Sequence, residues 1–146
     1  MDTRNMQLKS IYLDFDGVLH PNFAGEGQLF CHMQAFTDAL EGIQVQIVIS
    51  SSWRFQEEMD YLKGLFDTRI QGHVIGRTGD AHIGKWARWN EITQHAKTKT
   101  HHIKKWIALD DAYLEFPPDC KELILCDGRS GLQPKQLQQL VKWLKS

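Results

Sequence analysis

The sequence predicts an α/β fold of three layers, in which helices cover both faces of a central parallel sheet. Short apolar, β-branched runs alternate along the chain with segments whose apolar residues recur at helical spacing. Three of the apolar runs end directly in polar residues, at Asp14, Ser50 and Asp110. Ligands of such sheets bind outside the carboxyl ends of the strands, so these three residues are expected to meet at one edge of the sheet.

The expected elements follow from this periodicity and from the turn residues between the runs. We expect strands at residues 10–15, 45–49, 73–75, 106–109 and 123–126. We expect helices at residues 32–40, 55–66 and 85–96, and a last one that opens at Pro134. The second helix should bury one stripe, formed by Phe55, Met59, Leu62 and Phe66. Residues 18–29 are rich in Pro and Gly, which is typical of a tight turn followed by a short flap.

Length and composition suit a single domain over residues 1–146. The chain is 42% hydrophobic and 24% charged, which is ordinary for a soluble globular protein, and its net charge of −1 provides no general basic field. Residues 1–9 lack the apolar centre of a signal peptide, and no apolar run is long enough to span a membrane. The three cysteines form no CxxC pair. We therefore expect a cytoplasmic protein with reduced thiols and no membrane partner.

The stretch IYLDFDGV, residues 11–18, is the most informative part of the chain. Residues i and i+2 of a strand share a face, so Asp14 and Asp16 could point the same way. Gly17 then allows the backbone to turn sharply. Two carboxylates 4 Å apart repel by about 4 kcal/mol at an effective dielectric constant near 20. A divalent cation or a shared proton would offset that cost.

Three explanations of this stretch compete. It is a strand that ends in an Asp-rich turn, an EF-hand calcium loop, or a metal-assisted site for phosphate chemistry with one Asp as nucleophile. The EF-hand fails, because Val18 occupies the position of its third oxygen ligand and no helix precedes Asp14. The recurrence of polar residues after two further strands favours the phosphate site over the simple turn.

The ordered set of motifs resembles the haloacid dehalogenase (HAD) superfamily. It comprises DFDG at residues 14–17, Ser50 after the second strand, and Asp110-Asp111 after the fourth. The wider pattern is similar to the small HAD domains of RNA repair proteins and, more distantly, to the phosphatase half of polynucleotide kinase-phosphatases. Its further parts are Leu19-His20-Pro21, Ser50-Ser51-Ser52-Trp53-Arg54, Arg88 with Glu91-Ile92, and Gly131-Leu132. The resemblance implies a Rossmann-like HAD fold, and the spacing between the motifs leaves no room for a large cap domain.

The resemblance also implies roles for the acids and the serine. Asp14 would attack phosphorus and form an aspartyl-phosphate, and Asp16 would protonate the leaving oxygen and later activate water. Ser50 would donate a hydrogen bond to the transferring phosphoryl group, with Ser51 beside it in substrate binding. The alternative for Ser50 is a helix N-cap, a role that Ser52 could fill instead.

A cation is needed beside the phosphate, and the family supplies a Lys or Arg ahead of the last acidic motif. Arg88 is the first candidate and Lys85 the second, because both would share one face of the predicted helix. Arg54 could clamp a substrate phosphate. The alternative for each is a solvated surface charge. Asp110 and Asp111 would complete an all-oxygen metal site with Asp14 and Asp16, which favours Mg²⁺.

The sequence therefore predicts a magnesium-dependent phosphatase that hydrolyses phosphomonoesters, with nucleic-acid 3′ ends as the substrate that the resemblance favours. The cationic residues 97–105 could attract such a polyanion, although a solvated loop or helix face is the favoured explanation for them. Trp86 and Trp89 could stack bases, or belong to the core. A small-metabolite or nucleotide phosphatase is one alternative function. A non-catalytic regulatory module that binds phosphate or metal is the other.

Overall fold

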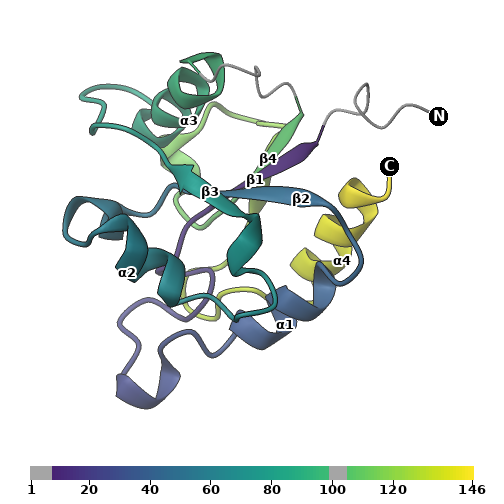
Figure 1. Ribbon diagram of the computed structural model, residues 1–146. Helices are drawn as coiled ribbons and strands as arrows, with labels where there is room; N and C mark the ends of the chain where they lie inside the picture. Colours follow the sequence, from purple (N-terminus) through teal and green to yellow (C-terminus); the bar gives the residue numbers. More distant parts are fainter. Residues whose placement is uncertain (1–7, 99–104) are drawn as a thin grey trace.

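The computed structural model describes residues 8–98 and 105–146, and its central feature is a five-stranded sheet with helices on both faces (Figure 1). The strands are β1 (Lys9–Leu13), β2 (Val45–Ile49), β3 (Val74–Arg77), β4 (Trp106–Asp110) and β5 (Leu123–Leu125). The helices are α1 (Met33–Ala39), α2 (Met59–Gly64), α3 (Ala87–Thr98) and α4 (Pro134–Leu144). All strand pairs are parallel, in the order β3-β2-β1-β4-β5, which confirms the predicted fold class.

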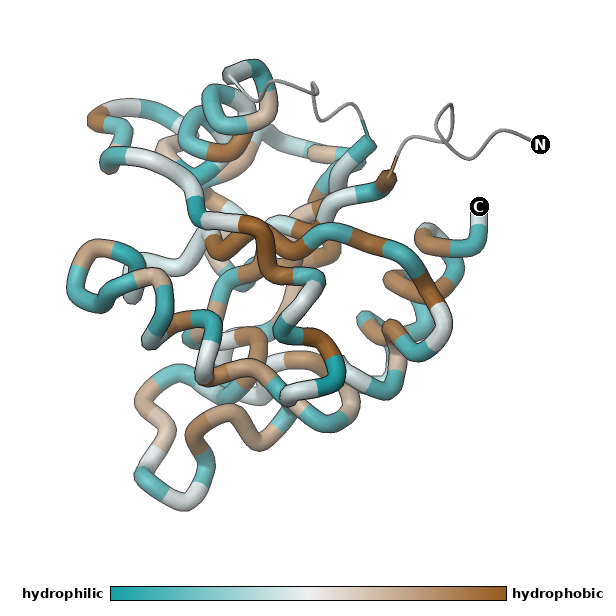
Figure 2. Tube along the Cα trace, in the orientation of Figure 1, coloured by the Kyte–Doolittle hydropathy of each residue, from teal (hydrophilic) through white to brown (hydrophobic). Residues whose placement is uncertain are grey.

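Alternate residues of the strands face two separate apolar layers. Ile11, Ile47 and Leu109 belong to the larger core, which α1, α2 and α4 cover with buried side chains such as Phe36 and Leu140. The intervening strand residues Tyr12, Val48 and Ala108 form the second layer, together with Ile92 of α3. Both faces of the sheet are buried, so its strands are near-continuous apolar runs, as the brown central segments of Figure 2 show.

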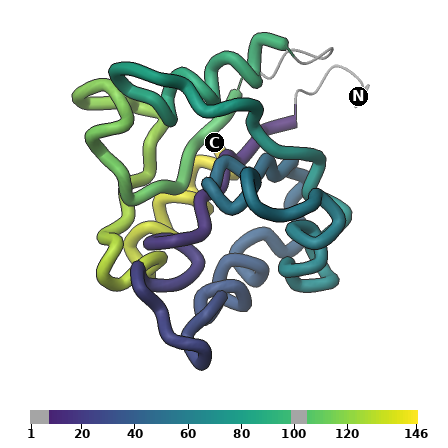
Figure 3. The backbone as a smooth tube through the Cα atoms, turned by 90° about the vertical axis from the view of Figure 1, so that its left-hand side faces the viewer, coloured from purple at the N-terminus to yellow at the C-terminus, as the bar shows by residue number. Residues whose placement is uncertain are grey.

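The register of the sheet brings three polar residues to one edge. Leu13 of β1 is paired with Ile49 of β2 and with Leu109 of β4. The next residue along each strand is Asp14, Ser50 and Asp110, respectively. The chain switches direction across the sheet between β1 and β4, which is where parallel sheets of this kind bind ligands. This edge lies on the left of Figure 1 and faces the viewer in Figure 3.

Two predicted helices differ from the observed ones. The segment expected to be helical over residues 55–66 begins as a 3₁₀ turn at Ser52–Phe55, and α2 starts only at Met59. The predicted stripe was therefore wrong at Phe55, whose ring is 53% exposed and lies 4.1 Å from the Arg54 guanidinium carbon. The helix predicted from residue 85 begins at Ala87, so Lys85 precedes it and does not share a helical face with Arg88.

Other features match or extend the sequence predictions. Gly17 has a φ of +78°, which confirms the sharp turn after the first motif. The cysteines Cys31, Cys120 and Cys126 are all free. Within residues 8–98 and 105–146, no helix has the length and apolar character needed to cross a membrane.

Candidate active site at the carboxyl edge of the sheet

Three carboxylates converge where β1 and β4 end, and we call Asp14, Asp110 and Asp111 the acid cluster. Each offers an oxygen atom within 4.8 Å of those of the other two. Asp14 and Asp110 are buried, and Asp111 is partly exposed. Backbone pairing sets this geometry, because the Asp14 amide donates to the Leu109 carbonyl over 3.1 Å. Three oxygen donors in this arrangement fit a hard divalent cation.

Burial and mutual repulsion perturb the acids of the cluster. Burial, reinforced by the neighbouring Asp110 carboxylate, raises the pKa of Asp14 well above its usual range. Burial also raises the pKa of Asp110, although the nearby Arg88 guanidinium opposes that shift. Cys126 lies beside the same acids, and its burial is the main reason that the pKa of its thiol rises to about 12. The site therefore favours groups that neutralise negative charge, and Cys126 remains a protonated thiol.

Arg88 forms ion pairs with two acids of the cluster. Its Nη1 lies 2.6 Å from Asp110 Oδ2 and 3.5 Å from Asp14 Oδ1, and its side chain is 11% exposed. Lys85, the second candidate, is exposed, and its ammonium lies 4.7 Å from the centre of the Trp86 ring. Of these two candidates, Arg88 alone forms an ion pair with the acid cluster.

Arg54 is turned inward in the structure, which differs from the expectation of a clamp that faces substrate. Its Nη1 donates to the Ser50 and Ser51 carbonyls, at 2.8 and 3.1 Å, and its Nη2 pairs with Glu91 at 2.8 Å. Glu91 also lies 3.7 Å from Arg88 Nε, so it links both arginines. Arg54 thus holds the turn after β2 in place, and it does so from a buried position.

Ser50 and Ser51, which follow β2, differ in the hydrogen bonds that their hydroxyl groups form. The Ser50 hydroxyl is buried, and no hydrogen-bond partner for it exists among the residues that the structure describes. A buried hydroxyl is normally satisfied, so this one is suited to an incoming acceptor. Ser51, expected to bind substrate, is the N-cap of the 3₁₀ turn, because its hydroxyl accepts a hydrogen bond from the Trp53 amide over 3.2 Å. The N-cap role proposed for Ser52 therefore falls to Ser51.

Asp16 is separate from the acid cluster. Its Oδ1 lies 2.7 Å from His20 Nε2, and its Oδ2 accepts a hydrogen bond from Trp53 Nε1 over 3.1 Å. Half of the Asp16 side chain remains exposed. Asp14 and Asp16 thus occupy different environments, one buried among acids and the other open to solvent.

Asn22 was not predicted, although it is part of the site. Its side-chain amide donates to Asp111 Oδ2 over 2.8 Å, and its backbone amide donates to the Gly128 carbonyl over 2.7 Å. A Cβ atom at Gly128 would collide with both Asn22 and Asp111, so this close approach requires glycine. The only sequence signal for Asn22 is its position two residues after His20 in the turn that follows the first motif.

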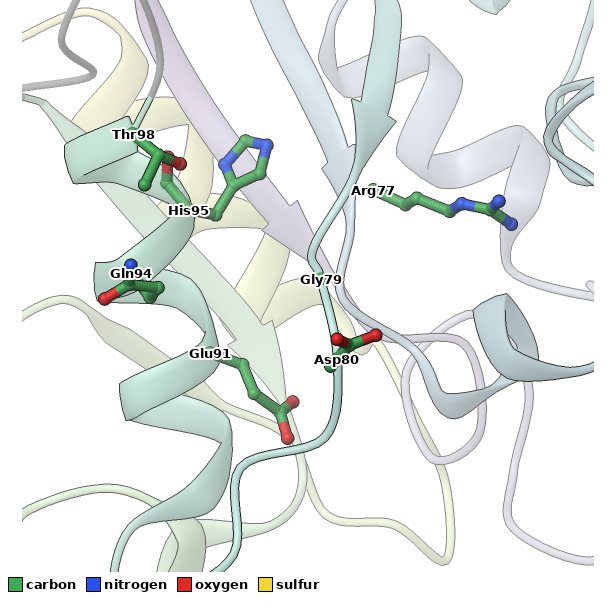
Figure 4. Close-up of a pocket in the computed structure, with 7 residues that line it drawn as sticks. All are labelled: Arg77, Gly79, Asp80, Glu91, Gln94, His95 and Thr98. Carbon is green, nitrogen blue, oxygen red and sulfur yellow. The ribbon is translucent and has the colours of Figure 1, made fainter.

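Two cavities flank this edge. One of about 410 Å³ adjoins the acid cluster and is lined by Asp111, Tyr113, Leu125, Cys126, Asp127, Gly128 and Gln136. The other, of about 310 Å³, lies between α3 and the segment after β3, and Figure 4 shows Arg77 pointing away from α3 there. Its lining includes Glu91 but none of the acid cluster. The first cavity is therefore the one placed beside the acids.

Trp89 is partly buried and packs against the second apolar layer, with its ring centre 5.5 Å from that of Trp106. Trp86 precedes α3 and has a φ of +55°. Residues 99–104 of the cationic stretch 97–105 lie outside the described residues, and Lys97 and Lys105 are exposed. Trp89 thus uses one part of its ring in packing, which supports the core role over base stacking.

A parallel sheet with acids after β1 and β4 and a serine after β2 defines a domain of the HAD superfamily. A family model described as "HAD domain in Swiss Army Knife RNA repair proteins" matches residues 10–137, and the chain belongs to that family. The match confirms the resemblance drawn from the motifs and a small α/β HAD domain without a cap. No curated protein and no solved structure matches the chain significantly.

Proposed function

We propose that this HAD-type domain is a magnesium-dependent phosphatase that hydrolyses phosphomonoesters through an aspartyl-phosphate on Asp14. The observation that carries the proposal is the acid cluster beside Arg88, with the unsatisfied Ser50 hydroxyl at the same edge of the sheet. Phosphate release from an aryl phosphate, with and without Mg²⁺, tests the proposal.

Each residue has a distinct role in the proposed reaction. Asp14 attacks phosphorus, Ser50 donates a hydrogen bond to a phosphoryl oxygen, and Arg88 balances the charge that spreads over the phosphoryl group. Asp16 gives a proton to the leaving oxygen and then takes one from the attacking water. Asp14, Asp110 and Asp111 would hold the metal ion, together with the Asp16 backbone carbonyl. The ion supplies charge stabilisation for the phosphoryl oxygens.

Magnesium is expected to raise the melting temperature, and to raise it more at neutral pH than near pH 5. The ordinary pKa of Asp14 is 3.8, and the folded protein holds its proton to a higher pH. The protonated Asp14 therefore contributes fully to the stability of the folded protein below the ordinary pKa, and this contribution is lost as the pH rises through the pKa of the folded state. Mg²⁺ binds the ionised carboxylates, which predominate at the higher pH, and a ligand that binds only the folded state stabilises it by about 2.7 kcal/mol at a concentration of 100 Kd. Differential scanning calorimetry at both pH values is the measurement, and an unchanged melting temperature in millimolar Mg²⁺ would argue against a metal site.

We further propose that the substrate is the phosphorylated end of an oligonucleotide, with a 3′-phosphate preferred. The family is named for RNA repair, no cap restricts access to the edge, and the cavity beside Asp111 carries Tyr113, which is 61% exposed and could stack on a base. Arg54 and Arg88 are engaged in internal ion pairs, so they are not free to bind flanking phosphates. The exposed Lys105 precedes β4, at the edge of the sheet opposite the acid cluster, so only phosphates several nucleotides away from the one removed would reach it.

A 3′-phosphorylated oligomer should show a higher kcat/KM than the matching 3′-mononucleotide, and the advantage should shrink as salt rises. Contacts to additional phosphates release counterions, which makes the affinity of the oligomer depend on salt. The two substrates are compared at low and high salt under otherwise identical conditions. Equal values at both salt concentrations would favour the alternative of a small-metabolite or nucleotide phosphatase.

A further inference from the structure

Two N–H donors from separate parts of the chain hold the Asp16 carboxylate. His20 Nε2 approaches Oδ1 at 2.7 Å, and Trp53 Nε1 donates to Oδ2 at 3.1 Å. Both oxygens are therefore fixed from the protein side, while half of the Asp16 side chain stays open to solvent. Together the two bonds set the plane of the carboxyl group and the direction of its exposed side.

His20 is locked so that its Nε2 carries the hydrogen. The ring is buried, and its Nδ1 accepts a hydrogen bond from the Phe30 amide over 3.1 Å. A nitrogen that accepts cannot also carry the donated hydrogen, so the other nitrogen is the donor to Asp16. The backbone returns His20 to this position, because the Gly17 amide donates to the His20 carbonyl over 2.8 Å.

Trp53 is fixed by aromatic packing. Its ring lies edge-on to Phe15 and Phe30, with centroid distances of 5.5 and 5.4 Å. It belongs to the 3₁₀ turn after β2, which Arg54 and the Ser51 cap hold in place. The indole N–H therefore reaches Asp16 from a rigid element that is remote in sequence.

Carboxylates that only stabilise a local turn have different partners in this structure. The carboxylates of Asp67 and Asp127 pair with arginines only two residues away, at the surface, and so stabilise local turns. Asp16 instead receives one donor from its own turn and one from the segment after β2, and both are fixed by further contacts. Such a supporting arrangement is what a group that must transfer protons in a defined direction requires.

We propose that His20 and Trp53 are positioning residues that aim the Asp16 carboxyl at the leaving-group oxygen. This inference rests on the proposed phosphatase function. In the first step an Asp14 oxygen bonds to phosphorus, the bond from phosphorus to the leaving oxygen breaks, and the Asp16 proton moves to that oxygen. In the second step water bonds to phosphorus, the bond to Asp14 breaks, and Asp16 takes the proton from water. Misalignment of the Asp16 carboxyl would slow hydrolysis most for substrates whose leaving group must be protonated.

The test compares kcat/KM for an alkyl phosphate, whose alkoxide leaving group needs a proton, with that for 4-nitrophenyl phosphate, whose leaving anion is stable. This ratio covers the steps up to formation of the aspartyl-phosphate. The variants are Trp53→Phe, which keeps the aromatic packing, and the pair His20→Gln and His20→Asn. Gln can place an amide N–H near the position of Nε2, whereas Asn can replace only Nδ1.

We expect His20→Asn and Trp53→Phe to lower kcat/KM for the alkyl phosphate about 10- to 100-fold more than for 4-nitrophenyl phosphate, a part of the 10²–10⁴-fold that acid–base catalysis contributes. His20→Gln should restore most of the difference. His32→Gln is the control, because the His32 Nε2 bond of 2.7 Å goes to the Ser130 carbonyl and not to Asp16. It should affect both substrates equally.

Equal losses for both substrates in His20→Asn and Trp53→Phe would overturn the positioning role, as would no loss in either variant. Melting temperatures identify any variant whose fold is damaged. The comparison of His20→Gln with His20→Asn then decides whether His20 positions Asp16 or only supports the fold. A wild-type protein that hydrolyses neither substrate would overturn the proposed function, and the inference with it. Activity on both substrates without selective loss would overturn the inference alone.

Discussion

Asp14→Asn is expected to abolish phosphomonoester hydrolysis and to leave the fold intact. The loss of kcat should approach the order of 10⁶ that follows removal of the nucleophile from a serine protease. The Asn side chain has the same size, and its oxygen can still accept the hydrogen bond that the Phe15 amide donates over 2.9 Å. Phosphate release from an aryl phosphate measures the loss of activity.

The stability of the same variant separates catalysis from folding. Burial and the Asp110 carboxylate disfavour the charged form of Asp14, so a neutral side chain at this position relieves repulsion in the metal-free protein. The melting temperature at neutral pH without metal should therefore not fall. Asp67→Asn, in a surface pair with Arg69, is the matched control and should keep full activity. Turnover near the wild-type rate in Asp14→Asn would show that Asp14 is not the nucleophile.

Arg88→Met is expected to lower the free energy of unfolding by about 3–5 kcal/mol at neutral pH, because it leaves buried carboxylates without their cation. Arg88 contacts both Asp110 and Asp14 from a nearly buried position. The loss should shrink at acid pH, where these carboxyls take up protons, and in Mg²⁺, which replaces the missing charge. Urea denaturation at two pH values, with and without Mg²⁺, measures these differences.

Arg129→Met is the matched control for the stability of Arg88→Met. Arg129 forms an ion pair with Asp127, but its side chain is 90% exposed. Removal of such a pair should leave the melting temperature nearly unchanged. If Arg88→Met proved as harmless as Arg129→Met, Arg88 would not be the cation that balances the acid cluster.

The positions of Asp14, Ser50 and Asp110 were predictable because parallel pairing places the residues after neighbouring strands at one edge. Strand spacing and apolar periodicity are local signals, and the backbone obeys them. Arg88 was a candidate on different grounds, because the family that the motifs resemble supplies a Lys or Arg ahead of the last acidic motif. The structure adds its contacts with the acids.

The directions of long side chains and the contributions of loops were not predictable in this way. Arg54 faces inward because buried Glu91, from a distant helix, attracts it, and no local pattern reveals that pairing. Asn22 reaches Asp111 only because Gly128 permits a close approach, and Gly128 lies more than a hundred residues further along. Phe55 does not belong to the predicted apolar stripe, because it lies in a 3₁₀ turn before α2 and is exposed. Each of these depends on contacts between remote segments.

Acid quench during turnover, followed by peptide mapping by mass spectrometry, tests the central claim most directly. The account predicts one added phosphoryl group on the peptide that contains Asp14, in larger amounts in Asp16→Asn, because Asp16 activates the water that removes it. No such group should form in Asp14→Asn. Two results would contradict the account, provided that the wild-type protein releases phosphate. One is that neither the wild-type protein nor Asp16→Asn carries a phosphoryl group on Asp14. The other is that the group is found on another residue.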